Sequence, residues 1–181
     1  YDLDLAFLRQ VLEEGLLLRR INIRQVMPSR REFPGVRSKE AFARFKRRVR
    51  EEVDTPMLGM VAPDGTVLTG VYTELREGGR TFGRQVGSYP ILVGLPYPYE
   101  VGKKVDVAVT GHGPRSVGGL VHPTDANTAT LSMLGAIPGI GKKRAMTIVR
   151  RRPFRDEGEL WALFDEPGAL RSARSHLSVG R

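Results

Sequence analysis

The middle of the chain, residues 57–121, restricts the fold more than any other part of the sequence. Short strand-like runs alternate there with turn residues. Residues 57–62 and 67–75 flank Pro63-Asp64-Gly65, a turn sequence typical of a β-hairpin. Five or six short strands within about 65 residues predict a small antiparallel β-barrel of the OB-like kind.

Helical patterns precede this region. Residues 2–18 and 39–53 repeat apolar side chains every three or four positions, and Ser38 is placed to cap the second helix. We expect Pro56 to end that helix, because proline interrupts helical hydrogen bonding. Residues 20–26 alternate polar and apolar side chains, which predicts a strand.

A helical pattern of residues returns after residue 124 and is interrupted over residues 137–141. The sequence therefore predicts an α+β fold in three domains. They are an N-terminal helix-strand-helix segment over 1–55, a small β-barrel over 56–123 and a helical domain over 124–181.

Basic residues outnumber acidic ones, and the surplus is clustered. The chain has 29 Lys and Arg against 20 Asp and Glu, which gives a net charge of +9. Residues 27–53 and 124–181 hold this excess, and the other segments are neutral. A clustered surplus of this size favours an anionic partner, with nucleic acid as the first expectation.

The break at residues 137–141 has its own chemistry. Two glycines permit positive φ, the isoleucine between them can fill the space between two short helices, and three bases follow. The N–H groups that open the second helix suit a phosphate oxygen. The predicted phosphate-binding residues are Gly139, Ile140, Gly141, Lys142, Lys143 and Arg144.

Two other glycine motifs fail here. A Walker loop needs Gly at Ala136 and Ser or Thr at Lys143, and a dinucleotide fingerprint needs Gly at Arg144 after a strand. A glycine-rich turn between two core helices, with merely solvated bases, stays open as the alternative.

Residues 128–152 resemble a helix-hairpin-helix nucleic-acid-binding motif. The resemblance implies contacts to the phosphate backbone, which position a nucleic acid without reading its sequence.

The barrel region resembles the TRAM-type RNA-binding barrel in its glycine-punctuated runs at 70–73, 79–84, 102–107 and 118–120. Arg80 and Arg84 lie four apart there, near Phe82 and Tyr89, a mixture that suits stacking on single-stranded bases. The alternative is that the aromatic rings belong to the barrel core and the arginines protect a strand edge.

Residues 17–26 resemble the end of a radical SAM barrel. This implies the C-terminal accessory region of an archaeal-type radical SAM protein, a predicted iron–sulfur oxidoreductase, with its catalytic domain elsewhere in the same polypeptide. The chain has no cysteine, so the Cys-x3-Cys-x2-Cys cluster motif of that family is absent. No cluster and no cleavage of S-adenosylmethionine is assigned to this chain, and we expect no cofactor in it.

We assign no catalytic residue, because no nucleophile elbow surrounds Ser116 and no paired carboxylates are apparent. The three histidines are far apart in sequence, so we expect no metal site. No apolar run approaches the ~18–20 residues of a membrane span, and no signal peptide is recognisable, so we expect a cytoplasmic protein without a membrane partner. The first residue, Tyr1, suggests a piece of a longer protein.

These observations predict a non-catalytic region that binds RNA, tRNA-like first, or DNA. A protein-interaction or oligomerisation module is the alternative. The third possibility is that the chain selects the substrate, a protein or a small molecule, for a radical enzyme.

Overall fold

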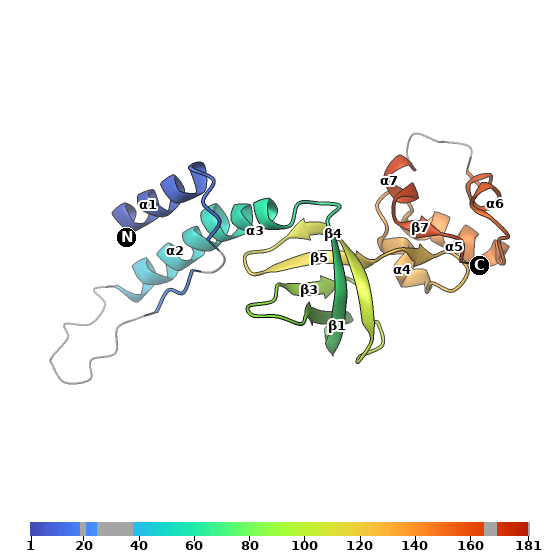
Figure 1. Ribbon diagram of the computed structural model, residues 1–181, viewed down its shortest axis with the longest axis horizontal. Coiled ribbons are helices and arrows are strands. Elements are labelled where there is room, and N and C mark those ends of the chain that lie inside the picture. The colour runs from blue at the N-terminus through green and yellow to red at the C-terminus, as the bar shows by residue number, and fades with distance from the viewer. Residues whose placement is uncertain (19–20, 25–37, 165–169, 181) are drawn as a thin grey trace. The chain divides into compact units, whose positions relative to one another are not determined.

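The computed structural model describes residues 1–18, 21–24, 38–164 and 170–180 (Figure 1). The fold is α+β, and the chain divides into two compact units. The first unit comprises Tyr1–Pro63 with His112–Ser116, and the second comprises Asp64–Gly111 with Val117–Arg181.

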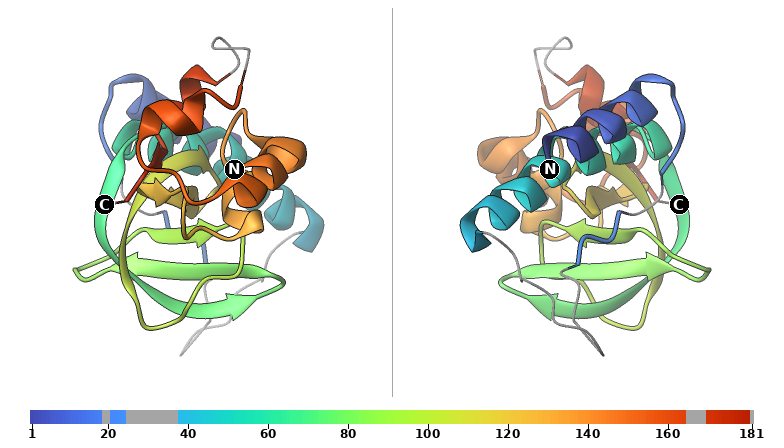
Figure 2. Two further views of the ribbon diagram at one scale, coloured as in Figure 1. Left: turned by 90° about the vertical axis from the view of Figure 1, so that its right-hand side faces the viewer. Right: turned by 90° about the vertical axis from the view of Figure 1, so that its left-hand side faces the viewer.

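The first unit is helical. Its elements are α1 (Asp2–Glu13), α2 (Lys39–Val49), the π-helical segment η1 (Arg50–Asp54) and α3 (Thr55–Val61). The Ser38 hydroxyl accepts a hydrogen bond from the Ala41 N–H at 3.1 Å, which confirms the predicted cap of α2. Leu5 of α1 packs with Val49 and Val53 into a buried cluster, and Figures 1 and 2 show α1 lying alongside α2.

Three predictions in this unit are wrong. Pro56 does not end the helix, because it lies in the first turn of α3, where a missing N–H needs no partner. Residues 57–62 form no strand, because residues 57–61 belong to α3, which buries Met57 and Leu58. Residues 21–24 also form no strand, and the rest of the predicted strand at 20–26 lies outside the described residues.

The turn chemistry at Pro63-Asp64-Gly65 is present, but it joins a helix to a strand. The predicted hairpin at this point is therefore wrong. Gly65 has φ +86°, and its N–H donates to the Val109 carbonyl at 2.8 Å. The turn thus directs the chain into the barrel.

The strands of the second unit's barrel are β1 (Val67–Glu77), β2 (Arg80–Gln85), β3 (Leu92–Leu95), β4 (Lys104–His112) and β5 (Ser116–Val121). The barrel is closed, with strand order β1-β2-β3-β5-β4, and β4 pairs back with β1. Its core contains buried side chains from all of these strands or their connections, among them Val71, Thr81, Val93, Tyr97, Val107 and Leu120. The small β-barrel predicted from the sequence is confirmed.

The last part of the chain is mainly helical, as predicted. A two-residue strand β6 (Thr124–Asp125) pairs in parallel with β7 (Leu177–Ser178). The Asp156 carboxylate accepts from the Glu159 N–H at 2.9 Å and caps α6 (Glu157–Trp161) as expected. The helices are α4 (Leu131–Ala136), α5 (Gly141–Arg151), α6 (Glu157–Trp161) and α7 (Arg171–Arg174).

Asp125 ties the two ends of this helical part together. Its carboxylate accepts hydrogen bonds from the Asn127 N–H at 3.0 Å, the Thr128 hydroxyl at 2.8 Å and the Gly180 N–H at 3.0 Å. Burial raises the pKa of Asp125, but these three donors and the charge of Arg152 outweigh it. The pKa is therefore lowered from its ordinary value.

We expect Asp125→Ala to lower the free energy of unfolding by about 1–3 kcal/mol at neutral pH, because it removes hydrogen bonds to a charged acceptor. A carboxyl whose folded pKa is depressed stabilises above its unfolded pKa, and this contribution is lost as pH falls through the folded value. Urea unfolding of both proteins at neutral pH and below pH ~4 measures this. A difference in stability that does not shrink toward acid would contradict it.

Candidate nucleic-acid interface

The turn between α4 and α5 is shaped by buried isoleucines and glycines. Ile137 and Ile140 are each 2% exposed, and the Ile140 N–H donates to the Ile137 carbonyl at 3.0 Å. Gly139 and Gly141 have φ of +88° and +60°, so an L side chain at either position would strain the backbone. The isoleucines hold the turn from inside, and the glycines leave its backbone open to solvent.

The bases that follow this turn have different surroundings. Lys142 and Lys143 are exposed in the first turn of α5. The Arg144 guanidinium instead donates to the Gly139 carbonyl at 2.8 Å and so closes the turn. The two lysines therefore place positive charge beside the first N–H groups of α5, where the helix dipole also favours an anion.

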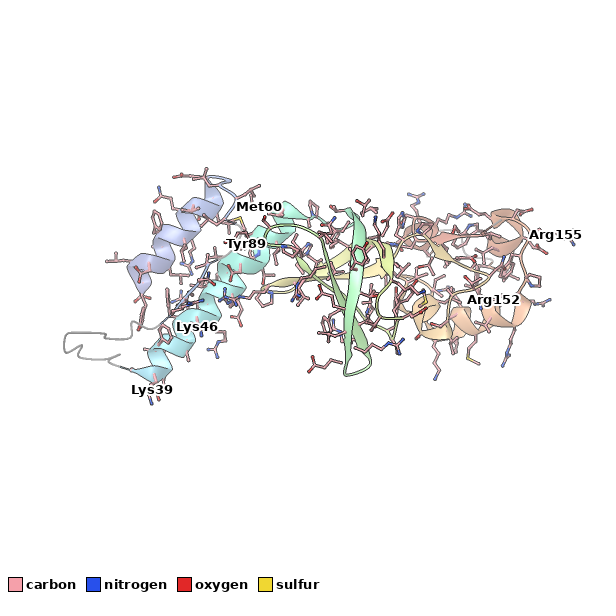
Figure 3. The ribbon with its side chains drawn as sticks, turned by 60° about the horizontal axis from the view of Figure 1, so that its bottom comes forward. Lys39, Lys46, Met60, Tyr89, Arg152 and Arg155 are labelled. Atoms are coloured by element: carbon pink, nitrogen blue, oxygen red, sulfur yellow. The ribbon has the colours of Figure 1, made fainter. Side chains whose placement is uncertain are left out.

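A side-chain clamp that the sequence does not reveal holds the α4–α5 pair. The Asn127 amide donates to the Phe154 carbonyl at 3.0 Å and accepts from the Phe154 N–H at 2.8 Å. Arg152, labelled in Figure 3 near the end of α5, donates to the Ala129 carbonyl. These hydrogen bonds join the start of the α4–α5 segment, at Asn127 and Ala129, to its end, at Arg152 and Phe154.

The predicted site residues do not all lie at the α4–α5 turn. Arg80 and Arg84 lie on strand β2 of the barrel. The Arg80 guanidinium lies over the Phe82 ring, 5.6 Å from its centre. Arg84 donates to the Glu74 carboxylate at 2.6 Å. Each arginine therefore already has a partner within the barrel.

The barrel register reveals two residues that sequence reasoning missed. Tyr72 of β1 pairs with Arg84 of β2 on one side and with Lys104 of β4 on the other. Paired residues on neighbouring strands present their side chains on the same face of a sheet. An aromatic ring that is 42% exposed is therefore flanked by two cations.

Helix α2 carries the other basic surface. Lys39 and Lys46 are labelled on it in Figure 3, and Lys46 lies 5.6 Å from the centre of the Phe42 ring. Arg48 forms an ion pair with Glu52 and donates a hydrogen bond to its carboxylate at 2.9 Å. This helix therefore mixes paired bases with solvated ones.

Within the described ranges, no group of three or more His, Cys, Asp or Glu side chains gathers as metal ligands would. No helix in the described part of the chain is long and apolar enough to cross a membrane.

Two archaeal proteins are similar to this chain. It is 39% identical over 174 residues to an uncharacterized protein of Archaeoglobus fulgidus, a match that covers 90% of this chain and 31% of the relative. It is 40% identical over 134 residues to an uncharacterized protein of Methanocaldococcus jannaschii, covering 67% of this chain and 24% of the relative. The chain thus spans less than a third of the length of either relative. No family model and no solved structure matches it.

Proposed function

We propose that this chain is a nucleic-acid-binding accessory region that grips phosphates through the turn between α4 and α5. In this proposal α4, the turn and α5 act as a helix-hairpin-helix. The turn backbone and the N–H groups of α5 bind a phosphate oxygen, and Lys142 and Lys143 supply the charge. The chain itself performs no catalytic step.

One observation carries the proposal. The turn combines two glycines of positive φ, buried isoleucines on either side of Gly139, and two exposed lysines at the start of α5. A glycine-rich turn that only joined two core helices would not need exposed cations at that point. This arrangement therefore favours phosphate binding over the purely structural alternative.

The barrel fits the same role as an OB-like or TRAM-like RNA-binding fold, because such barrels bind single strands on their outer face. We propose further that the region belongs to a larger cytoplasmic radical SAM enzyme. The greater length of both archaeal relatives leaves room for another domain. This chain has no cysteine, so an iron–sulfur cluster would be held by another part of such a protein.

A binding titration tests the proposal. Fluorescence anisotropy with labelled hairpin RNA, single-stranded RNA and duplex DNA would be recorded at two salt concentrations. We expect submicromolar binding that weakens steeply as salt rises, since binding releases counterions from phosphates. No binding to any of the three at low salt would contradict the proposal.

A protein-interaction or oligomerisation role is the second candidate, and the apolar side chains of α1 favour it. Leu3 is 87% exposed and Phe7 is 63% exposed, one turn apart on the same helix. Such a face suits an apolar partner surface.

If α1 mediates self-association, sedimentation velocity will show an oligomer that persists at high salt, because apolar contacts are little screened. Leu3→Ser/Phe7→Ser would then return the chain to a monomer. A monomeric wild-type chain would show that this face does not mediate oligomerisation.

A further inference from the structure

A surface pocket of about 440 Å³ lies on the barrel, apart from the α4–α5 turn in sequence. Its lining combines an aromatic ring, a cation, a carboxylate and an amide, contributed by β1, β2 and β4. The lining residues are Thr69, Gly70, Tyr72, Gln85, Val86, Lys104 and Asp106.

A β-bulge opens this pocket. The pairing of β1 with β4 shifts register between Leu68 and Val71, so the two residues between them leave the ladder. The second of these, Gly70, has φ +67°. Its Cβ position would lie 3.1 Å from Cε of Lys104, so the absence of a side chain makes room for the lysine.

The pocket's own polar side chains hold the bulge. The Gly70 N–H donates to Oδ1 of Asp106 at 2.8 Å, and Nε2 of Gln85 donates to the Thr69 carbonyl at 2.8 Å. Backbone groups that the bulge removes from the ladder are thus satisfied by Asp106 and Gln85. The same bonds fix the orientation of that carboxylate and that amide in the pocket.

Lys104 supplies the positive charge of the pocket, and Tyr72 supplies its aromatic surface. Lys103 pairs with Glu100 at 3.2 Å, whereas no carboxylate of the described residues lies within ion-pair distance of Lys104. The Lys104 charge is therefore available to an anionic ligand. Tyr72 offers an exposed aromatic face, on which a nucleobase stacks irrespective of its identity.

The chemistry of Asp106 selects among the bases. An ionised carboxylate only accepts hydrogen bonds. The Watson–Crick edge of guanine has two adjacent donors, N1–H and N2–H, beside the O6 acceptor, whereas the edges of adenine, cytosine and uracil each have donors at one position only. When the base is unpaired, that edge is free to be read.

We propose that this pocket binds an unpaired guanine. The base stacks on Tyr72, its N1–H and N2–H donate to Asp106, and Lys104 meets the nucleotide phosphate. The proposal rests on the proposed nucleic-acid-binding function and names the base that the barrel recognises.

Seven-nucleotide uridine RNAs with G, A, C or U at the centre test the preference, with free GMP as a separate arm. We expect the guanine strand to bind roughly tenfold more tightly than the other three, the range expected for a bidentate contact. GMP should bind more weakly than the guanine strand. GMP binding as tightly as the strand would assign the pocket to a free nucleotide and overturn the strand proposal.

Asp106→Asn is the decisive variant. The asparagine oxygen keeps the bond from the Gly70 N–H, while one acceptor becomes an amide donor. We expect the guanine preference to disappear, with the melting temperature and the affinity for the uridine strand maintained. A preference that survives Asp106→Asn would overturn the proposal, as would equal binding of all four strands by the wild-type chain.

Two matched pairs check the other contacts. Tyr72→Leu should weaken all four strands by roughly tenfold through lost stacking, and Tyr72→Phe should not. Lys104→Ala should weaken them, while Lys103→Ala, one residue away, should have little effect. The Lys142→Glu/Lys143→Glu variant should retain the guanine preference, so failure of the pocket and failure of the α4–α5 turn are distinguishable.

Discussion

Reversing the charges of Lys142 and Lys143 together, as Lys142→Glu/Lys143→Glu, is expected to lower the affinity for duplex nucleic acid by roughly 10- to 100-fold. Both side chains are exposed at the start of α5, where each can meet a phosphate. The substituted carboxylates would repel the same phosphate. Because phosphate contacts do not read bases, the loss should be uniform across sequences. Fluorescence anisotropy with two unrelated duplexes measures it.

The opposite end of α5 provides a matched control. Arg150→Glu/Arg151→Glu makes the same change of charge at two exposed positions of the same helix. It leaves the glycine turn and the helix N-terminus intact. We expect a much smaller loss of affinity, and circular dichroism should show both variants folded. Equal losses from the two pairs would mean that only the overall charge matters, and the turn would lose its assigned role.

Gly83→Ala is expected to destabilise the barrel by more than about 3 kcal/mol. A Cβ at this position of β2 would lie 2.3 Å from the Tyr72 carbonyl oxygen and 2.9 Å from the Tyr72 carbonyl carbon. These are backbone atoms of the paired strand, so no side-chain rotation can relieve the clash. The strands must separate, and urea unfolding would report the lost stability.

Gly111→Ala is the control for this substitution. Gly111 lies on β4, its φ is not positive, and nothing lies within 4 Å of its Cβ position. We expect its unfolding midpoint to stay near that of the wild type or rise slightly. Similar destabilisation by both substitutions would show that glycine flexibility, rather than close strand packing, matters in this barrel.

Local chemistry explains what could be predicted from the sequence. The turn at Gly139 and Gly141 was predictable because positive φ and helix capping depend on neighbouring residues. The barrel was predictable because glycine and proline separate its strands. Residues 57–62 were assigned wrongly because a short apolar run suits a buried strand as well as a helix.

Contacts between distant residues were not predictable. Tyr72 and Lys104 face each other only through the register of β1 and β4, which a bulge at Gly70 shifts. Asn127 and Phe154 form their clamp across a whole helix pair. In neither case does the spacing of the two residues in the sequence indicate that they are in contact, because the contact depends on tertiary packing alone.

The salt dependence of duplex binding tests the central claim most directly. The affinity of the wild-type chain and of Lys142→Glu/Lys143→Glu would be measured across a series of salt concentrations. The phosphate-binding role of the turn predicts that the slope of log affinity against log salt becomes shallower by about 2 in the variant, roughly one for each lysine. Equal slopes for the two folded proteins would contradict that role.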